Sequence, residues 1–448
     1  MAHWTTKLKP NINNTTTTTD PIKIQRGIFQ GDALSPLWFC MALNPLSELL
    51  NNTGIGFKLK HENSHYIISH LMYMYDIKIY ASNNSELTKL ADITQLFSAD
   101  IQMRFGVDKC KVHSISHGKT IQNTYILDTG ETIEPMDEHA TYKYLGFHQS
   151  KHILQKRAKS EITKKFKLRL NQNLRTQLNS GNIIKAINTY AIPTLTYSFG
   201  IIRWFQSDLT KLQRIINTHL TTYREHHPKS CIQRLTLPRR NGGRGVIDIR
   251  NVHNSLITKL RHYFHWKAEH TQLHKHVTDI DKNLTPLNLH NKSTESHHHI
   301  TTAQHKADIW LQKSLHGRHP ADLSQTHVDK VASNEWLRRG ELFPETEAFM
   351  CAIQDQIINT RNYQKHMLRI PNLTSEQCRR CYSASETIQH ITGACKSIAQ
   401  TDYKHRHDQV AAIIHQHLAF NHSLITHKTA YYKYKPTSIL ESANHKLY

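Results

Sequence analysis

A pair of short segments near the start of the chain constrains the fold more than any other feature. The first, Arg26-Gly-Ile-Phe-Gln-Gly-Asp-Ala-Leu-Ser-Pro36, is followed by an apolar stretch that predicts a helix after Pro36. The second, Leu71-Met-Tyr-Met-Tyr-Asp-Ile-Lys-Ile-Tyr80, predicts two β-strands with Tyr75 and Asp76 between them. We therefore expect a hairpin whose polar tip is exposed.

Residues 26–150 mix strand-like and helix-like patterns, which predicts an α+β domain. Before them, residues 1–25 form a polar lead-in that is rich in Asn and Thr and has no hydrophobic period. The strand-like runs are Phe57–Lys60, Tyr66–Tyr73, Ile77–Ala81, Cys110–Ser116 and Tyr142–Phe147, and the helix-like run is Glu86–Met103.

The rest of the chain is predicted to be mainly helical. Residues 151–250 carry Lys and Arg among Ile, Leu and Phe, and residues 251–370 continue as helices with polar interruptions. The glycines of Asn241-Gly-Gly-Arg-Gly245 predict a flexible joint, because glycine adopts backbone angles barred to other residues. The final segments are residues 371–420, which hold a cysteine cluster, and a tail at residues 421–448.

The chain is strongly basic. It has 448 residues with 57 Lys and Arg against 35 Asp and Glu, a formal net charge of +22. A basic balance of this kind favours contact with phosphates, so we expect nucleic acid as a partner rather than a merely solvated basic surface. The basic helices from Lys156 to Arg224, together with Arg239, Arg240 and Arg244, are predicted to contact phosphates independently of sequence.

The cysteines indicate a reducing compartment. Their number, seven, is odd, and three of them cluster near the C-terminus, which is unlike a disulfide framework. The N-terminus lacks the charged and apolar regions of a secretory signal, and no apolar stretch approaches the length of a membrane span. We therefore expect an intracellular protein that does not enter a membrane.

The cysteine cluster predicts a zinc site. Cys378, Cys381, His390 and Cys395 follow the spacing Cys-x2-Cys-x8-His-x4-Cys, and three thiolates with one imidazole are a common tetrahedral set. The alternative is a pair of surface cysteines with an unrelated histidine, in a chain that has 35 histidines. We favour zinc. Cationic neighbours such as Arg379, Arg380 and Lys396 suit a knuckle that binds nucleic acid.

Several motifs in order resemble the reverse transcriptases of non-LTR, target-primed retrotransposons, of the class with a C-terminal restriction-like endonuclease. The resemblance covers nearly everything from residue 23 to the end. Besides the two opening segments and the cysteine cluster, the matches are Phe105-Gly-Val-Asp-Lys-Cys110, Tyr142-Lys-Tyr-Leu-Gly-Phe147, His227-Pro-Lys-Ser230, Leu237-Pro-Arg-Arg-Asn-Gly-Gly-Arg-Gly-Val-Ile-Asp248 and Ser438-Ile-Leu-Glu-Ser-Ala-Asn-His-Lys-Leu-Tyr448.

The resemblance implies roles for individual residues. Asp76 would be a catalytic metal ligand, and Lys109 would approach the triphosphate of the incoming nucleotide. Tyr144, Leu145 and Gly146 would grip the primer terminus. The template and the nucleotide would lie against Gln30 and Gly31, and the supporting helix would begin at Ser35 and Pro36.

The resemblance also implies a domain order. Residues 26–150 would be a partial palm, 151–250 a helical thumb, 251–370 a helical linker and 371–420 a zinc knuckle. The tail at residues 421–448 would precede an endonuclease, and we expect no strand nicking by this polypeptide.

Two departures from the family pattern bear on activity. The family hairpin has Tyr-x-Asp-Asp, but here Tyr75 takes the place of the first Asp. We also expect the first metal-binding Asp of the family to be missing, because Asp20 lacks an apolar strand around it. Polymerases hold two Mg²⁺ ions with carboxylates, and a tyrosine phenol is neutral at pH 7. We therefore expect that Mg²⁺ is not bound competently and that the chain is inactive as a polymerase.

Three hypotheses follow. The first is a degenerate RNA-directed DNA polymerase that still binds RNA and DNA, whose nuclear location the resemblance implies. The second is a zinc-containing nucleic-acid-binding protein that retains no catalytic ancestry in its role. The third, which we favour least, is a zinc-stabilised interaction module unrelated to nucleic acid. None of them requires a small-molecule substrate other than a nucleotide.

Overall fold

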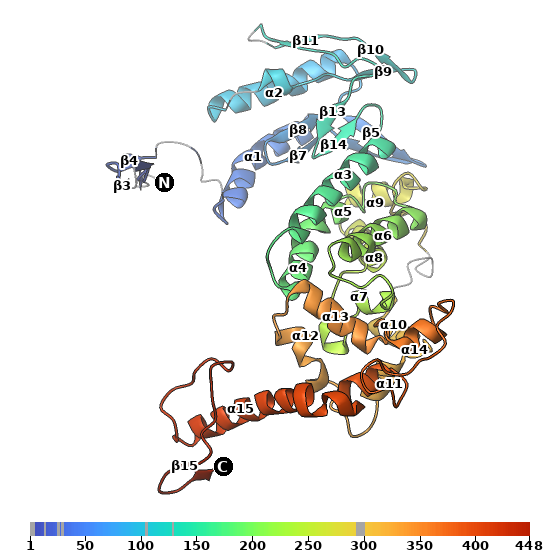
Figure 1. The fold of residues 1–448 in the computed structure, drawn as a ribbon. Helices are drawn as coiled ribbons and strands as arrows, with labels where there is room; N and C mark the ends of the chain where they lie inside the picture. Colours follow the sequence, from blue (N-terminus) through green and yellow to red (C-terminus); the bar gives the residue numbers. More distant parts are fainter. Residues whose placement is uncertain are drawn as a thin grey trace. The chain divides into compact units, whose positions relative to one another are not determined.

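The computed structural model describes residues 5–12, 15–24, 27, 31–103, 106–127, 130–292 and 301–448. It combines helices with paired antiparallel strands, so the predicted α+β class is confirmed (Figure 1). The chain divides into two compact units that interleave along the sequence. Unit 1 comprises Met1–Phe166, Pro193–Leu209 and Arg250–Ile300, and unit 2 comprises Lys167–Ile192, Thr210–Ile249 and Thr301–Tyr448.

The core of unit 1 forms between two helices and a hairpin. Helix α1 (Ser35–Asn52) has a proline in its first turn, where the missing N–H is not needed. Helix α2 (Asn84–Asp100) is capped by the Asn83 side chain, which accepts a hydrogen bond from the Glu86 N–H at 2.9 Å. Fully buried Leu46, Leu50 and Leu90 pack together against strand residues Met72, Ile77 and Ile79.

Every sheet among the described residues consists of two antiparallel strands. Each of these hairpins keeps two unpaired edges. The pairs are β1 (Thr5–Thr6) with β4 (Ile22–Lys23), β2 (Asn11–Ile12) with β3 (Thr15–Thr16), β5 (Phe57–His61) with β6 (Ser64–Ile68), β7 (His70–Tyr73) with β8 (Asp76–Ile79), β9 (Ser114–Ser116) with β10 (Lys119–Ile121), β11 (Tyr125–Ile126) with β12 (Thr132–Ile133), β13 (Tyr142–Tyr144) with β14 (Phe147–Gln149) and β15 (Leu440–Glu441) with β16 (Lys446–Leu447).

Helices from later in the sequence complete unit 1. Helix α8 (Ile249–Ala268) packs Ile257 against Leu287 and Leu289. Helix α9 (Gln272–Ile280) contacts the β5–β6 hairpin, where the His276 ring lies 6.0 Å from the Tyr66 ring and its Nε2 lies 3.2 Å from the Ser64 hydroxyl. The predicted linker therefore contributes directly to the packing of the predicted palm.

Unit 2 is helical and contains charged side chains in its core. Arg244 is 1 % exposed and lies 3.2 Å from Glu225 and 2.6 Å from Glu347. Arg239 adds a second cation to Glu347 at 2.8 Å.

The helices that begin or lie in this unit are α4 (Ser180–Ala186), α7 (Ile232–Thr236), α10 (Ala303–Leu311), α11 (Arg318–Leu323), α12 (Glu335–Arg339), α13 (Pro344–Gln354), α14 (Arg361–His366) and α15 (Lys404–Asn421). Helices α3 (Gln155–Leu174) and α6 (Gln206–Thr222) contribute residues to both units, and the short α5 (Pro193–Thr196) belongs to unit 1.

Two predictions about the glycine-rich segment are wrong. Gly242, Gly243 and Arg244 are buried, so the segment is a packed turn and not a flexible joint. Gly243 is required there because an added Cβ would lie 2.1 Å from the carbonyl oxygen of Leu237. Arg244 does not face phosphate, because its guanidinium is enclosed with carboxylates inside unit 2.

Among the described residues, every helix is too short or too polar to cross a membrane.

Candidate functional site

The β7–β8 hairpin presents the residues that the sequence singled out. Tyr73 pairs with Asp76 across the ladder, and Met74 turns the chain with a φ of 53°. Tyr75 is 76 % exposed at the tip, while Asp76 is half-buried at the start of β8. The predicted hairpin is confirmed, but Asp76 is the first residue of β8 and not part of the tip, which consists of Met74 and Tyr75. The exposed ring at the tip is a phenol where the motif has a carboxylate.

The surroundings of Asp76 are aromatic rather than acidic. Burial raises the pKa of Tyr142 and of Tyr144, and the negative charge of Asp76 raises both pKa values further. The Lys78 ammonium lies 5.6 Å from the centre of the Tyr144 ring and donates a hydrogen bond to Gln149 at 3.2 Å. Within the described part of the chain, no group of three or more His, Cys, Asp or Glu side chains suited to a metal includes Asp76.

The start of helix α1 lies beside this tip. The Sγ atom of Cys40 is 4.0 Å from the Sδ atom of Met74. Gly31 has a φ of 94° in the turn before the helix, Ser35 is buried at the helix start, and Pro36 is exposed next to it. Gln30 lies outside the described residues. Helix α1, which follows the segment Arg26–Pro36, therefore lies next to the β7–β8 hairpin, which contains the segment Leu71–Tyr80.

Lys109 lies on an exposed single turn of 3₁₀ helix, Val107–Lys109. Burial is the largest cause that raises the pKa of the Tyr142 phenol. The charges of Asp76 and of Cys110, the residue after Lys109, raise it further. This shared neighbour connects the Lys109 segment to the hairpin tip.

The predicted primer grip is the turn between β13 and β14. Leu145 and Gly146 both have positive φ angles, 46° and 86°, as a two-residue hairpin turn of type I′ requires. The Tyr197 hydroxyl donates a hydrogen bond to the Leu145 carbonyl at 2.9 Å, and the Tyr197 ring stacks on Phe147 at 5.5 Å. Tyr144 is buried and Leu145 is half-buried, whereas Gly146 is exposed.

Tyr197 was not identified from the sequence. It follows α5, far along the chain from the turn that it holds, and a tyrosine in a helical segment carries no signal for such a contact. The contact between Tyr197 and the β13–β14 turn is visible only in the folded structure.

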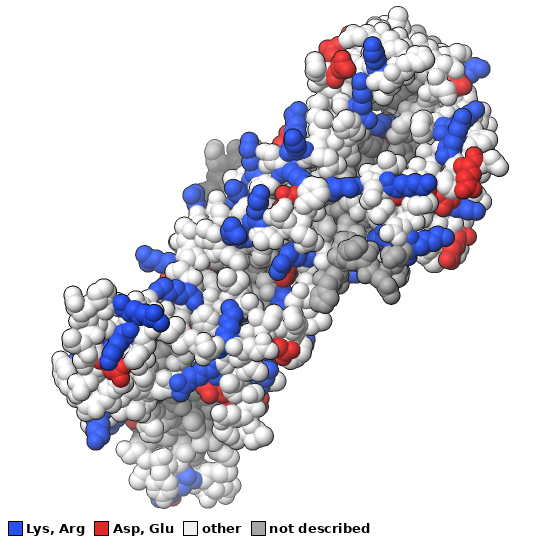
Figure 2. Space-filling model, turned by 90° about the vertical axis from the view of Figure 1, so that its right-hand side faces the viewer, with Lys and Arg blue, Asp and Glu red and all other residues white. Residues whose placement is uncertain are grey.

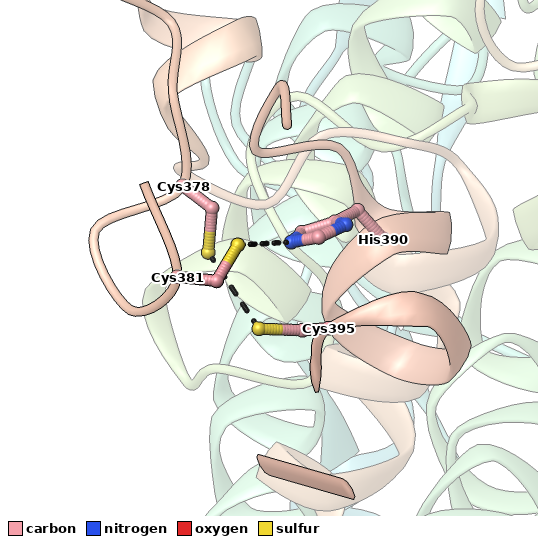
Figure 3. A group of neighbouring side chains, drawn as sticks. All are labelled: Cys378, Cys381, His390 and Cys395. Carbon is pink, nitrogen blue, oxygen red and sulfur yellow. Dashed lines mark hydrogen bonds between the residues drawn. The ribbon is translucent and has the colours of Figure 1, made fainter. Parts of the chain in front are cut away.

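The four residues of the cysteine cluster converge in unit 2 (Figure 3). Their ligand atoms all lie within 4.8 Å of one another. The Sγ atoms of Cys378 and Cys395 are 3.9 Å apart, and the Sγ atom of Cys381 is 3.2 Å from Nε2 of His390. Cys378 and Cys395 are each 1 % exposed.

This geometry fits a tetrahedral zinc ion. With Zn–S bonds of about 2.3 Å, two thiolates of a tetrahedral site lie roughly 3.8 Å apart. Hydrogen bonds from Ser383 lower the pKa of the Cys381 thiol to about 6, which favours the thiolate that zinc requires. Three thiolates and one imidazole fill the coordination shell, so such a site is structural and leaves no position for a reacting water.

Two further residues build the frame of this cluster. The Tyr403 hydroxyl donates to the Ile391 carbonyl at 2.8 Å and accepts from the Cys395 N–H at 3.1 Å. The buried Glu386 carboxylate binds the Arg379 guanidinium at 2.6 Å and the Arg361 N–H at 3.0 Å. Sequence reasoning missed both Tyr403 as a support and the use of Arg379 in an internal ion pair.

Cations are widespread on the surface of the protein. On the face drawn in Figure 2, Lys and Arg side chains are spread broadly, and Asp and Glu side chains are sparser. Helix α3 contributes exposed Lys156, Lys164 and Lys165, whereas its Lys159 is paired with Asp208 at 2.6 Å.

Comparison with known families bears on the first part of the chain. Residues 2–149 match the model of the family described as reverse transcriptase (RNA-dependent DNA polymerase). This region is similar to a reverse transcriptase. The match contains the β7–β8 hairpin and ends at Gln149, the last residue of β14, so the zinc-type cluster lies beyond it. No curated protein matches the chain.

Proposed function

We propose that this chain is a reverse-transcriptase-family protein of a non-LTR, target-primed retrotransposon that binds RNA and DNA but does not polymerise nucleotides. The observation that carries the proposal is the β7–β8 hairpin itself, in which an exposed Tyr75 stands directly before Asp76, inside the region similar to reverse transcriptases.

The chemistry of nucleotide transfer explains the loss of synthesis. Polymerases use two Mg²⁺ ions, which stabilise the attacking and the leaving oxygen, and Mg²⁺ needs anionic oxygen ligands. The hairpin supplies one carboxylate, so a single negative charge faces two divalent ions. Tyr75 places a phenol where a second carboxylate would stand, so the electrostatic repulsion between the ions is left uncompensated. Asp76 alone therefore does not hold the metal pair that catalysis requires.

Binding to nucleic acid needs none of this metal chemistry. Exposed lysines of α3 provide charges for phosphates, and Arg380 and Lys396 are exposed beside the cysteine cluster. Cys378, Cys381, His390 and Cys395 would hold a zinc ion that stabilises this knuckle. Within the proposal, Gln30, Gly31, Ser35 and Pro36 lie along the template path, Lys109 near the nucleotide, and Tyr144, Leu145 and Gly146 at the primer strand. A target-primed element acts on chromosomal DNA, which places the protein in the nucleus.

A salt series tests the binding. Fluorescence anisotropy of a labelled RNA template annealed to a DNA primer should show an affinity that falls linearly with salt on logarithmic axes, with the purified 448-residue chain. The variant Lys156→Ala/Lys164→Ala/Lys165→Ala should reduce the slope by roughly 0.7 to 0.9 for each phosphate contact that is lost.

The matched control removes the same charge elsewhere. The variant Lys9→Ala/Lys282→Ala/Lys330→Ala also deletes three exposed lysines and should keep a slope closer to that of the parent. Equal slopes for the two variants would contradict the role of α3, and no binding by the parent chain would contradict the proposed function itself.

A further inference from the structure

Helix α8 of unit 1 has a solvent-facing aromatic surface that the fold does not use for its own core. Its inner face packs Ile257, Leu260 and Phe264 against Leu287 and Leu289. Its outer face leaves Tyr263 46 % exposed and Trp266 54 % exposed. Two large rings three residues apart on one helix offer a partner flat apolar surface whose burial is favourable.

Two histidines each lie beside one of these rings. The His270 ring lies 5.0 Å from the Trp266 ring, and the His274 ring lies 5.9 Å from the Tyr263 ring. His270 Nδ1 lies 2.8 Å from the Trp266 carbonyl oxygen, and His274 Nδ1 lies 2.6 Å from the hydroxyl of Thr271. We call the four rings Tyr263, Trp266, His270 and His274 the aromatic stripe. Its two histidines are held by these contacts, beside the rings of Trp266 and Tyr263.

The charge around the stripe is positive. Residues 259–275 contain Lys259, Arg261, Lys267 and Lys275 and a single acid, Glu269. Lys259 and Lys275 are exposed, and the Lys267 ammonium lies 5.1 Å from the centre of the Trp266 ring. Burial, and after it the charge of Lys267, lowers the pKa of His274, which favours the neutral form of this ring.

The stripe is held in a defined position within unit 1. The Arg261 guanidinium on α8 donates a hydrogen bond to the Asn288 carbonyl at 2.6 Å. This bond ties α8 to the loop that contains Asn288. At the far end of α9, Asp279 lies 3.8 Å from His61 of the β5–β6 hairpin. Because His274 of the stripe lies on α9 itself, the stripe is anchored to the region similar to reverse transcriptases.

We propose that the aromatic stripe is a binding site for single-stranded nucleic acid, in which unpaired bases stack on Trp266 and Tyr263 while Lys259, Lys267 and Lys275 contact the flanking phosphates. Alternating flat rings and cations match the alternating bases and phosphates of an unpaired strand. A duplex does not fit this chemistry, because its bases are already stacked and its accessible charge is the backbone alone. This site deepens the proposed function and rests on it.

The decisive comparison uses oligonucleotides with and without bases. Anisotropy titrations would measure the 448-residue chain and the variant Tyr263→Leu/Trp266→Leu with a labelled oligo-dT and with an abasic strand of equal length and charge. Stacking on one base is worth about 5-fold to 150-fold in affinity, so the variant should weaken oligo-dT binding at least 5-fold. Binding of the abasic strand and of a duplex should change less than 2-fold, on the order of the scatter expected for a lost surface contact.

Three controls separate stacking from loss of structure. Trp266→Phe keeps an aromatic ring and should keep most of the oligo-dT affinity. Phe343→Ala, which deletes a ring that is 73 % exposed in unit 2, should leave it unchanged. Ultraviolet crosslinking of the parent chain to oligo-dT should label the peptide that contains residues 259–275.

The outcomes distinguish this inference from the proposed function. If the parent chain binds oligo-dT and the Tyr263→Leu/Trp266→Leu variant binds it equally well, the aromatic stripe is not the single-strand site, although the proposed function stands. If the parent chain binds neither strand nor duplex, the proposed function fails as well.

Discussion

At the scale of single residues, Tyr75 decides the chemistry of the hairpin while leaving its shape intact. The turn depends on the backbone of Met74, which has a φ of 53°, and on the pairing of Tyr73 with Asp76. The side chain of Tyr75 points into solvent and takes no part in that pairing. An aspartate or a tyrosine therefore folds equally well here, but only an aspartate adds negative charge for metal ions.

A buried histidine in unit 2 makes stability depend on pH. His226 is 4 % exposed and lies near the cations Arg244 and Arg234, and burial followed by these charges lowers its pKa to about 3. In the unfolded chain its pKa is near ~6.5. Above that pH neither state binds the proton. Between about 6.5 and 3 the unfolded state binds it and the folded state does not, so stability falls as the pH decreases.

Replacing this histidine should remove part of the acid sensitivity. We expect His226→Phe to lose less stability than the parent chain between pH 8 and pH 5, by up to about 1.4 kcal/mol for each pH unit below 6.5. Thermal unfolding followed by circular dichroism at both pH values measures the difference. His407→Phe, at an exposed position, is the control and should behave like the parent. An unchanged pH dependence in His226→Phe would show that His226 is protonated in the folded chain.

At the scale of elements, short-range patterns were predictable and long-range contacts were not. The β7–β8 hairpin, helix α1 and the convergence of the cysteine cluster follow from local alternation, a proline at a helix start and ligand spacing. The packing of α9 on the β5–β6 hairpin joins segments that are far apart in sequence, and nothing in either segment specifies the other. Tyr197 at the β13–β14 turn escaped prediction for the same reason.

The glycine-rich segment shows how composition can mislead. Three glycines indicate freedom when only their own backbone angles are considered. In the fold, Gly243 is selected because the Leu237 backbone approaches too closely for any Cβ. Arg244, which lies between these glycines, is enclosed by Glu225 and Glu347, so its positive charge forms ion pairs inside unit 2. Burial cannot be read from glycine content or from a positive charge alone.

The cysteine cluster is the element whose stability depends most on a ligand. The protein should contain one zinc ion per chain by elemental analysis, and Cys395→Ser should lower the zinc content at least tenfold, because one of four ligands is lost. Cys40→Ser removes an exposed cysteine outside the cluster and should retain the metal. Chelation should reduce the far-ultraviolet helix signal. Full zinc content in Cys395→Ser, or a spectrum that chelator does not change, would contradict a structural zinc site.

At the scale of the whole molecule, the excess of positive charge lies mainly on the surface. The buried cations Arg234 and Arg244 are matched by Asp355, Glu225 and Glu347 within unit 2, so they add little to the field outside. The formal charge of +22 is therefore carried by exposed side chains. Such a field attracts polyanions and repels a second copy of the same chain, which favours binding to nucleic acid over self-association.

The proposed function requires that the protein binds nucleic acid without synthesising it. Affinity for nucleic acid comes from many exposed cations and aromatic rings, and each contributes a part. Synthesis depends on a small group of carboxylates at one point, where the loss of one ligand removes the metal pair. Under the proposed function, the chain binds nucleic acid through its many surface groups but lacks the carboxylates that synthesis requires.

Incorporation of labelled deoxynucleotide on a primed RNA template tests this separation most directly. The assay compares the 448-residue chain with its Asp76→Ala variant, in Mg²⁺ and in Mn²⁺, at a protein concentration where the template is bound. We predict equal, background incorporation for both proteins together with unchanged template binding. Incorporation by the parent chain above that of Asp76→Ala would contradict the conclusion that a hairpin with Tyr75 beside a single carboxylate cannot support polymerisation.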